Sequence, residues 1–474
     1  MVFSSISFIF YFLPIFFLLY FQGRFKNLVL LLASLVFYAW GEVEYSAILL
    51  FSITINYFFG LMIARGKFIS PRLALTFGIM VNLSLLIYFK YANFIMNNLN
   101  MLLPDRIGPL HLDPVRLPLG ISFFTFHALS YLIDVYRHDA EVEKNPITLS
   151  AYITMFPQLV AGPIIRYQTI FREFRARTES LENFTRGIKF FVIGLGQKVL
   201  IANTLAVPAD AIFNSSIDGL GWPLAWLGAI CFTLQIYFDF LGYSNMAVGL
   251  GLMLGFHVPQ NFNYPYISDS ITEFWRRWHI TLSRWFRDYL YIPLGGNRTG
   301  NLRTYLNLLI VFFLCGLWHG ANWTFIAWGL YYGLFLIIER MGFKEILIRF
   351  PVFVRHVYVM VVVILGWVLF RSNDIQMAAG YIKTMFGFGA AGHTTQPARF
   401  YLENDVILAL MCGIVGSMPW APVLNRWFNA IARDTRWEKL LAEPVSLVCL
   451  TLVMALTAAS LASGTSNPFI YFRF

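Results

Sequence analysis

The feature that most constrains the fold of this chain is a series of long apolar runs, which recurs along nearly its whole length. A helix that spans a bilayer needs about 20 mostly apolar residues, and it satisfies its own backbone hydrogen bonds where water is absent. The sequence therefore predicts an all-α, polytopic membrane protein with about 11 or 12 transmembrane helices. The runs lie at residues 6–21, 27–40, 45–64, 73–89, 117–136, 187–205, 223–240, 306–318, 323–338, 358–370, 406–420 and 445–461.

The composition indicates a single membrane domain over residues 1–474 rather than a soluble domain with an anchor. Charged residues make up 13% of the chain and hydrophobic residues 58%, whereas a soluble domain carries about 25% charge. Membrane lipids are thus the expected surroundings. No positive segment precedes the run at residues 6–21 and no small-residue cleavage site follows it, so we expect a span and not a cleaved signal.

The positive charges between the runs predict the orientation in the membrane, because cytoplasmic loops are enriched in Lys and Arg. With Met1 outside, successive crossings place the basic loops in the cytoplasm and leave poorer loops, such as residues 207–221, outside. This bias accounts for the net charge of +10 without a nucleic-acid partner. The predicted cytoplasmic loops carry Arg24 and Lys26, Arg65 to Arg72, Arg166 to Arg186, Arg276 to Arg303, Arg340 to Arg355, and Arg426 to Lys439.

Two further apolar stretches must not cross the membrane if this alternation is to hold. Residues 149–165 contain two prolines and a glycine, and residues 242–256 are rich in glycine. Non-helical backbone at membrane depth is tolerated where protein or a water-filled cavity surrounds it. We therefore expect both stretches to be re-entrant pieces that line an internal chamber. Residues 387–397 are expected to form an exposed outer loop.

Residues 270–298 are the most informative segment of the chain. Ser270 and Glu273 have the spacing of a capping box, which predicts a helix start near Ile271. Apolar residues then recur at helical spacing and place His279 on the apolar face, while arginines lie on the other side. An amphipathic helix in the cytoplasmic interface explains the arginines. It does not explain a histidine on the apolar face.

The second informative segment, residues 316–329, reads GLWHGANWTFIAWG. His319 lies between two apolar runs, where an ionisable residue is costly and is a candidate for function. A single buried histidine can also be a hydrogen-bonded core residue, but His279 and His319 together favour a shared role. Glycines on both sides of His319 would let the backbone approach a thioester closely. Asn322 could polarise a carbonyl or bond to backbone.

Histidine chemistry suits acyl transfer, because a neutral imidazole can take the proton from an attacking hydroxyl. Apolar surroundings favour that neutral form. The chain contains no HExxH, GxSxG or P-loop motif, and no cysteine pair has zinc-ligand spacing, so we expect neither a metal nor a bound cofactor. Weaker polar candidates inside apolar sequence could line a pathway or pair with one another: His127, Lys198, Asp239 and His257. Asp239 and Tyr243 lie in the stretch of residues 237–256, which we expect to wall a polar chamber and to contact substrate.

Three stretches together resemble the membrane-bound O-acyltransferase family, in particular its bacterial branch of alginate O-acetylation proteins. They are FWRRWHITLSRWFRDYLYIPLGGNR from Phe274, GLWHGANWTFIAWG from Gly316 and MFPQLVAGPI from Met155. The opening MVFSS and the closing FIYFRF resemble that branch as well. The resemblance covers essentially the full chain, and the combination is far more specific than one histidine.

This resemblance implies a fold and an active site. The family's fold is a ring of transmembrane helices with re-entrant helices around a central tunnel, open to a cytosolic acyl donor on one side and an acceptor on the other. His319 matches the family's membrane-embedded catalytic histidine. His279 matches a second active-site position that is histidine or asparagine across the family. The phosphates of coenzyme A would then meet a basic cluster, which we place at Arg276, Arg277, Arg284 and Arg287.

For this branch the resemblance implies acetyl-CoA as acyl-donor substrate, an exported polysaccharide as acceptor, a periplasmic partner acetyltransferase of the SGNH type, and the bacterial inner membrane as location. Alginate is the expected polysaccharide. Alternatives in the same class are acylation of cellulose or peptidoglycan and D-alanylation of teichoic acid. From other classes, a transporter or flippase would use the histidines in a proton path, and a silent scaffold would need neither.

Overall fold

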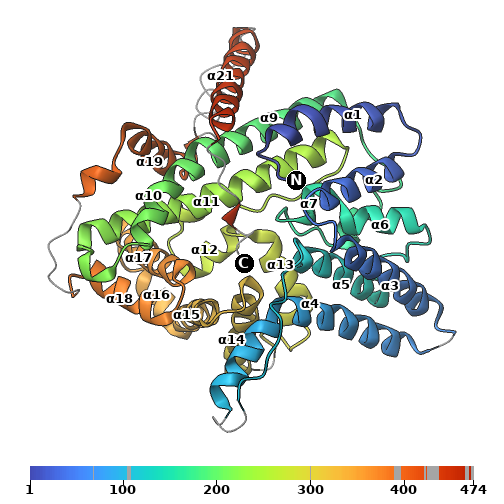
Figure 1. The fold of residues 1–474 in the computed structure, drawn as a ribbon, viewed down its shortest axis with the longest axis horizontal. Coiled ribbons are helices and arrows are strands. Elements are labelled where there is room, and N and C mark those ends of the chain that lie inside the picture. The colour runs from blue at the N-terminus through green and yellow to red at the C-terminus, as the bar shows by residue number, and fades with distance from the viewer. Residues whose placement is uncertain are drawn as a thin grey trace.

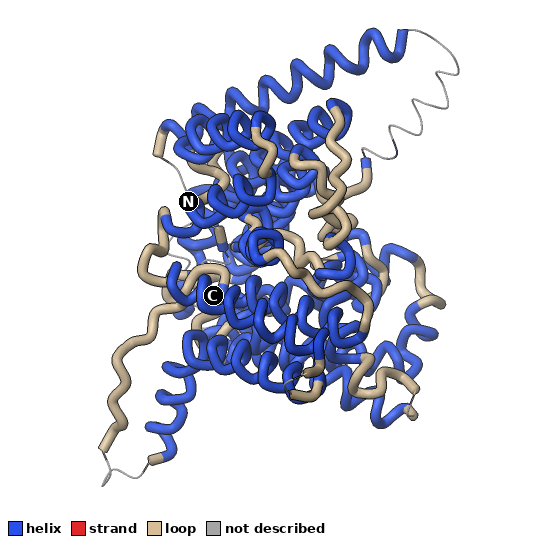
Figure 2. Tube along the Cα trace, turned by 90° about the vertical axis from the view of Figure 1, so that its right-hand side faces the viewer, coloured by secondary structure: helices blue, strands red, loops and turns tan. Residues whose placement is uncertain are grey.

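The computed structural model describes residues 1–67, 69–103, 108–298, 300–388, 397–420, 423, 437–464 and 469–470, and no strand occurs among them (Figure 2). The longer elements, in chain order, are η1 (Ser7–Phe12), α1 (Leu13–Gln22), α2 (Lys26–Ala39), α3 (Ser46–Arg65), α4 (Pro71–Leu102), α5 (Ile121–Arg137), α6 (Pro146–Thr154), α9 (Leu181–Gly196), η2 (Gln197–Ala202), α10 (Asn203–Phe213), α11 (Trp222–Met253), α12 (Ile271–Arg277), α13 (Ile280–Phe286), η5 (Arg287–Tyr291), α14 (Asn301–His319), α15 (Trp323–Ile338), η6 (Glu339–Phe343), α17 (Val352–Arg371), α18 (Ile375–Met385), α19 (Asn404–Gly416) and α21 (Trp437–Ala462). The predicted all-helical class is confirmed.

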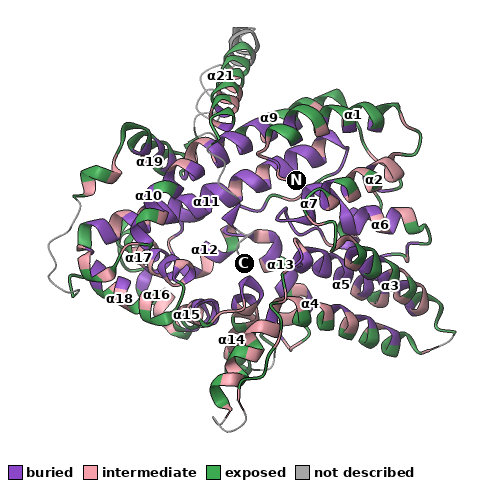
Figure 3. Cartoon of the chain, viewed as in Figure 1, coloured by how far each residue is buried: buried purple, intermediate pink, exposed green. Residues whose placement is uncertain are grey.

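The helices surround two short central helices, α12 and α13 (Figure 1). Residues of α5, α11 and α13 are mostly buried, whereas the outer faces of α1, α3, α4 and α21 are exposed and apolar (Figure 3). Large apolar side chains on an outer surface suit contact with lipid tails rather than water.

Seven described helices are long and apolar enough to cross a membrane, and three shorter apolar helices accompany them. The long ones are Ser46–Arg65, Pro71–Leu102, Leu181–Phe213, Trp222–Met253, Asn301–His319, Val352–Arg371 and Pro444–Ala462, and the shorter ones are Ser7–Gln22, Lys26–Ala39 and Asn404–Gly416. Fewer full-length spans are described than the 11 or 12 expected. The difference arises because several of the expected runs form helices shorter than about 20 residues, such as α15 with 16.

The prediction that residues 242–256 are re-entrant is wrong, because α11 runs without a break over its 32 residues. Its glycines are needed for close packing against α9. A Cβ added to Gly242 would lie 2.6 Å from the carbonyl oxygen of Gly194, and one added to Gly249 would lie 2.5 Å from that of Gly187. Small residues let membrane helices approach backbone to backbone. The glycine pattern thus marks a helix crossing and not a loop.

We expect Gly194→Val to lower the free energy of unfolding by about 1–3 kcal/mol, which is typical of overpacking. The new side chain would meet the Gly242 carbonyl oxygen at 2.5 Å, and a backbone atom cannot rotate away. Thermal unfolding in detergent and abundance in membranes measure the effect. Gly333→Ala on α15 is the control, because its nearest neighbours are side-chain atoms at 3.3 Å that can move. Equal stability of the two variants would contradict the crossing.

The expected interruption of residues 149–165 is confirmed. The chain forms α6, turns at Met155, forms one turn of helix α7 (Phe156–Leu159), and continues without regular structure to Arg166. Neither helix is long enough to span a bilayer. The segment is buried from Ala151 to Ile165, with Gln158 fully enclosed. Irregular backbone at this place is therefore surrounded by protein, as its tolerance in a membrane requires.

Loops predicted to be cytoplasmic contact one another across the sequence. Lys26 pairs with Glu179, Arg166 pairs with Asp288, and Arg355 contacts the Asp269 carboxylate at 2.5 Å. Within one of these loops, Arg175 lies 2.7 Å from Glu141. The hydrogen bond from Arg175 lowers the pKa of the exposed Glu141 carboxyl. These contacts place the basic loops on one side of the molecule, as the charge pattern predicts. Most of residues 387–397 and the basic run from Arg426 to Arg436 lie outside the described residues.

Loops predicted to lie on the opposite side also meet. Trp323 Nε1 donates to Asn98 Oδ1 at 2.9 Å, and Arg371 lies 2.7 Å from Asp210. By the charge pattern, His319 at the end of α14 lies toward the predicted outer side. The chain enters α12 from the predicted cytoplasmic side. The two histidines thus approach the centre from opposite directions.

Candidate active site

His279 sits at a break between two short helices, and not on one continuous helix as the periodicity predicts. Ser270 Oγ accepts from the Glu273 amide at 3.2 Å and confirms the start at Ile271. The helix then ends at Arg277, because its next backbone groups pair with a neighbouring loop: Asn263 N donates to Arg277 O at 3.0 Å, and Ile280 N donates to the backbone oxygen of Asn261 at 2.9 Å. His279 itself is left-handed, with φ 43° and ψ 55°.

Left-handed backbone is uncommon for a residue other than glycine and is concentrated at functional sites. Here it allows the His279 ring to point into the protein, where 1% of the residue is exposed. The ring lies edge-on to Phe240, with centroids 4.6 Å apart. The break therefore directs this histidine inward, although the arginines on either side of it remain at the surface.

Asn261 fixes the orientation and the tautomer of His279. Asn261 Oδ1 accepts from the backbone amide of Thr281 at 3.2 Å and lies 3.0 Å from His279 Nδ1. Since an amide N–H can only donate, this atom is the oxygen, and His279 Nδ1 must be its second donor. The lone pair of the neutral ring is then on Nε2, which no group in the described part of the chain hydrogen-bonds.

The same network ties the irregular segment after α7 to the histidine. Thr281 Oγ1 donates to Asn261 Oδ1 at 2.9 Å and accepts from the amide of Ile164 at 3.0 Å. Thr281 is 4% exposed, so these bonds are shielded from water. The stretch that begins at Met155 is thus part of the wall of the site.

His319 is the last residue of α14 and lies in an aromatic enclosure. Its ring centroid is 4.8 Å from that of Trp318, 4.9 Å from that of Trp328 and 5.3 Å from that of Phe370. The Trp318 ring also lies 6.3 Å from the ring of His279. Both predicted histidines therefore adjoin the same indole, although 40 positions separate them in the sequence.

The glycines beside His319 pack helices together, in contrast to the predicted approach of backbone to a thioester. A Cβ on Gly316 would lie 2.3 Å from the carbonyl oxygen of Phe325, and one on Gly320 would lie 2.2 Å from the Phe325 ring. α14 and α15 thus cross at contact distance. This crossing places His319 against Trp328.

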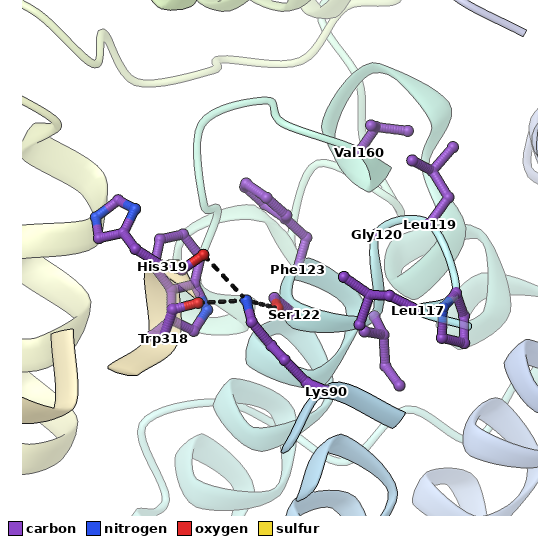
Figure 4. A pocket seen from close by; sticks show the side chains of 11 residues that line it. Lys90, Leu117, Leu119, Gly120, Ser122, Phe123, Val160, Trp318 and His319 are labelled. Atoms are coloured by element: carbon purple, nitrogen blue, oxygen red, sulfur yellow. Dashed lines mark hydrogen bonds between the residues drawn. The ribbon is translucent and has the colours of Figure 1, made fainter. Parts of the chain in front are cut away.

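A cavity of about 80 Å³ opens beside His319 and Trp318 (Figure 4). Lys90 enters it from α4, and its Nζ donates to the backbone oxygen of Trp318 and, at 3.3 Å, to Ser122 Oγ. Residues 117–123 and Val160 form the facing wall. The cavity thus joins α4, α5, the irregular segment and the end of α14.

A second cavity, of about 560 Å³, shares Lys90 with the first and lies beyond Gly320. Asn322 lines it, but its side chain is occupied: Oδ1 accepts from the Thr324 amide at 3.1 Å, and Nδ2 donates to Asn373 O at 2.8 Å. Asn322 is therefore the N-cap of α15. This agrees with the second of its two predicted roles, a hydrogen bond to backbone. Because Asn322 and Asn373 come from predicted outer loops, this cavity lies on the predicted outer side, next to Phe370, whose ring contacts His319.

The four predicted donor-binding arginines lie on α12, α13 and η5. Arg276, Arg284 and Arg287 are exposed, and Arg277 is half-buried. Arg277 pairs with Glu273 at 2.7 Å and Arg287 with Asp288 at 2.7 Å. Arg276 and Arg284 therefore remain the more available of the four.

The two predicted polar residues of α11 have structural partners. Asp239 is buried, lies 2.5 Å from Lys198 Nζ, and accepts from the amide of Ile470 at 2.7 Å. Tyr243 is buried between the rings of Phe3 and Phe469, at 4.6 Å and 4.8 Å. Neither residue lines the two cavities beside His319. The expected pairing of buried polar residues is thus confirmed for Asp239 and Lys198.

The two other histidines predicted from the sequence, His127 and His257, do not line either cavity beside His319. His127 is buried against Tyr152, with ring centroids 5.4 Å apart. His257 is exposed and pairs with Glu173 at 2.9 Å, so its predicted position inside the membrane is wrong. It follows α11 in a loop, because the helix ends earlier than the apolar pattern suggests.

Sequence reasoning missed Lys90 and Asn261. Lys90 is a lysine near the end of the apolar run at residues 73–89, a signal that marks it as a functional candidate. Asn261 lies in a polar loop, and nothing in its sequence surroundings indicates a histidine partner 18 positions away. Only the tertiary fold reveals that contact.

A family model and several known proteins are similar to this chain. Residues 68–378 match the family model described as MBOAT, membrane-bound O-acyltransferase family. A relative in Pseudomonas putida, named "Probable alginate O-acetylase", is 42% identical over 100% of both chains. A peptidoglycan O-acetyltransferase of Helicobacter pylori is 38% identical over 85% of this chain and 84% of its own. A teichoic acid D-alanyltransferase of Bacillus subtilis is 33% identical over 52% of this chain and 67% of its own.

Proposed function

The chain belongs to the membrane-bound O-acyltransferase family, and we propose that it relays acetyl groups from cytosolic acetyl-CoA to an exported polysaccharide, with alginate as the first candidate. The observation that carries the proposal is the meeting of His279 and His319 at Trp318 beside a buried cavity. The relative over the full length carries the name of an alginate O-acetylase, which supports the choice of polymer and of acetyl.

In this mechanism His319 is the general base. It takes the proton of the attacking hydroxyl as the hydroxyl oxygen bonds to the acyl carbonyl carbon, and it returns the proton to the departing thiolate. His279, whose ring is held by Asn261 through Nδ1, packs against the same indole and orients His319. The aromatic enclosure of His319 excludes water and so limits hydrolysis of the donor.

The donor would approach from the basic side and the acceptor from the larger cavity. Such an arrangement lets the two substrates meet at the histidines without either crossing the bilayer. In a bacterium the acceptor side would be the periplasm, the membrane would be the inner membrane, and a partner acetyltransferase of the SGNH type would pass the acetyl group to the polymer.

We expect the double charge reversal Arg284→Glu with Arg287→Glu to raise KM for acetyl-CoA about tenfold, because two cations that attract its phosphates become repulsive. The measurement is initial rate against donor concentration in membranes at low and high salt, with the difference shrinking at high salt. Arg349→Glu, an exposed arginine away from α13, is the matched control. An unchanged KM would remove these arginines from donor binding and leave them to membrane orientation.

The proposed function is tested by isotopic transfer. Inverted membrane vesicles or intact cells that carry the chain receive acetyl-CoA labelled in the acetyl group, and ester-linked label on exported polymer is identified by mass spectrometry. Label on alginate supports the full proposal, and label on cellulose or peptidoglycan changes the acceptor. D-alanyl esters would change the acyl group. Chain-dependent solute transport without esters would replace the acyltransferase mechanism with transport.

A further inference from the structure

A cavity of about 520 Å³ on the predicted cytoplasmic side shares no lining residue with the two cavities beside His319. Its walls are the start of α2, the start of α6 and residues 174–179, which all belong to loops predicted to be cytoplasmic. α1, α2 and α6 lie at the edge of the ring of helices, apart from α12, α13 and α14 (Figure 1). The charged residues that line this cavity are Arg24, Lys26, Arg175, Arg177 and Glu179.

The cavity carries an excess of positive charge, with four cations against one carboxylate. Glu179 pairs with Lys26, and Arg175 lies 2.7 Å from Glu141. Neither Arg24 nor Arg177 has a carboxylate within ion-pair distance among the described residues. A cavity of about 650 Å³ that shares Arg175 is lined by three Lys or Arg residues and three carboxylates. A basic loop therefore does not by itself produce such an excess.

Arg177 is held in place by uncharged partners. Its Nη1 donates to the Tyr20 hydroxyl at 2.6 Å, and its Nη2 donates to Asn27 Oδ1. The guanidinium also lies 4.6 Å from the centroid of the Phe256 ring. Tyr20 in turn donates to the backbone oxygen of Leu254 at 2.9 Å. These contacts use two of the five N–H groups of the guanidinium, so the cation is fixed before a ligand binds and keeps donors for an anion.

Arg24 supplies a second cation at the start of α2. It is exposed and makes no hydrogen bond with the described residues. α2 begins two residues later, and its N-cap residue Phe25 forms no side-chain cap. The first amides of a helix carry partial positive charge and favour an anion. The start of α2 therefore adds to the charge of Arg24 and Arg177.

The cavity adjoins the apolar outer face of α1. Phe25 lines the cavity and is 73% exposed, and the ring centroid of Phe21, 43% exposed, lies 6.0 Å from Lys26 Nζ. Leu18 and Leu19 continue this exposed apolar surface along α1. Because α1 ends at Gln22 on the predicted cytoplasmic side, a lipid whose acyl chains follow α1 has its headgroup at the level of the cavity. A soluble phosphate compound gains nothing from the apolar surface.

We propose that the cavity binds the phosphodiester group of an anionic phospholipid from the cytoplasmic leaflet. Arg24 and Arg177 contact the phosphate oxygens, and the apolar side chains of α1 contact the acyl chains. Basic pockets between membrane helices on the cytoplasmic side bind such headgroups, and guanidinium donors match the geometry of phosphate. The bound lipid joins α1, α2 and α6 at the edge of the ring and so stabilises the folded protein.

The test is lipid binding to the full chain in nonionic detergent, measured by the rise in unfolding temperature as phosphatidylglycerol is added to the micelles. We expect a saturable rise, and a much smaller one with zwitterionic phosphatidylcholine. Reversal of one charge removes an attraction and adds a repulsion, so Arg24→Glu should raise the half-saturating lipid fraction about 30-fold and Arg24→Gln about fivefold. Arg349→Glu makes the same charge change at an exposed arginine of another predicted cytoplasmic loop, and it should change that fraction less than twofold.

Equal stabilisation by phosphatidylglycerol and phosphatidylcholine would overturn the proposal. So would equal weakening in Arg24→Glu and Arg349→Glu, which indicates a general attraction between the basic side and an anionic surface. Inorganic phosphate and coenzyme A form two further arms at the same phosphate concentration. An effect of either that equals the effect of phosphatidylglycerol would replace the lipid with a soluble phosphate. None of these measurements uses acyl transfer, so their outcome is independent of the proposed function.

Discussion

Replacement of His319 by alanine is expected to lower polysaccharide O-acetylation about 10⁴-fold, at the upper end of what one general base contributes. The rings of Trp318, Trp328 and Phe370 enclose the His319 imidazole. No neighbouring side chain of that enclosure can accept a proton in its place. The measurement is ester-bound acetate per unit of polymer, with membrane abundance compared with wild type.

His127→Ala is the matched control for this variant. It also removes a buried imidazole, but from a site that packs against Tyr152 and lies outside both cavities. We expect acetylation per folded molecule to change less than threefold. Normal acetylation in His319→Ala at normal abundance would reject His319 as the base and favour transport or scaffolding.

His279→Ala is expected to lower kcat about 10³-fold, because it removes the ring that Asn261 orients and leaves a void beside Phe240. Alanine also fits the left-handed backbone at this position poorly, which costs about 1–2 kcal/mol. Part of any loss could therefore reflect folding. Rates normalised to folded protein, together with thermal unfolding, separate the two effects.

His279→Asn provides that separation, since asparagine tolerates left-handed backbone and keeps a polar group. We expect the stability of this variant to stay near wild type, while kcat remains intermediate between wild type and His279→Ala. If His279→Ala and His279→Asn lose stability but keep the wild-type kcat per folded molecule, His279 supports the backbone break and not the reaction.

The sequence by itself determined the fold class and the candidate histidines. Apolar runs of the length of a bilayer leave helices as the available structure, because backbone groups in lipid must be paired locally. Charge bias predicted which loops lie together, and pairs such as Lys26 with Glu179 agree. An ionisable residue in apolar sequence is costly wherever the chain folds, and this cost alone singled out His319.

Helix breaks and glycine crossings were decided by the tertiary structure. Periodicity predicted a helix through His279, but the loop at Asn261 and Asn263 takes its backbone hydrogen bonds and turns the chain left-handed. Glycines in α11 suggested a re-entrant piece, but they meet glycines of α9 that are distant in sequence. Local patterns report the preferences of a segment, and a neighbouring segment can supply partners that override them.

The assembly of the site also depended on the tertiary structure. His279, His319 and Lys90 come from three separate parts of the chain and meet at Trp318. Their chemistry could be read from residue types, since imidazoles and an ammonium keep their properties in any order along the chain. Their proximity could not, because contacts between distant segments follow from how whole helices pack. The sequence thus determined which groups can react, and the packing of α4, α13 and α14 decided which of them meet.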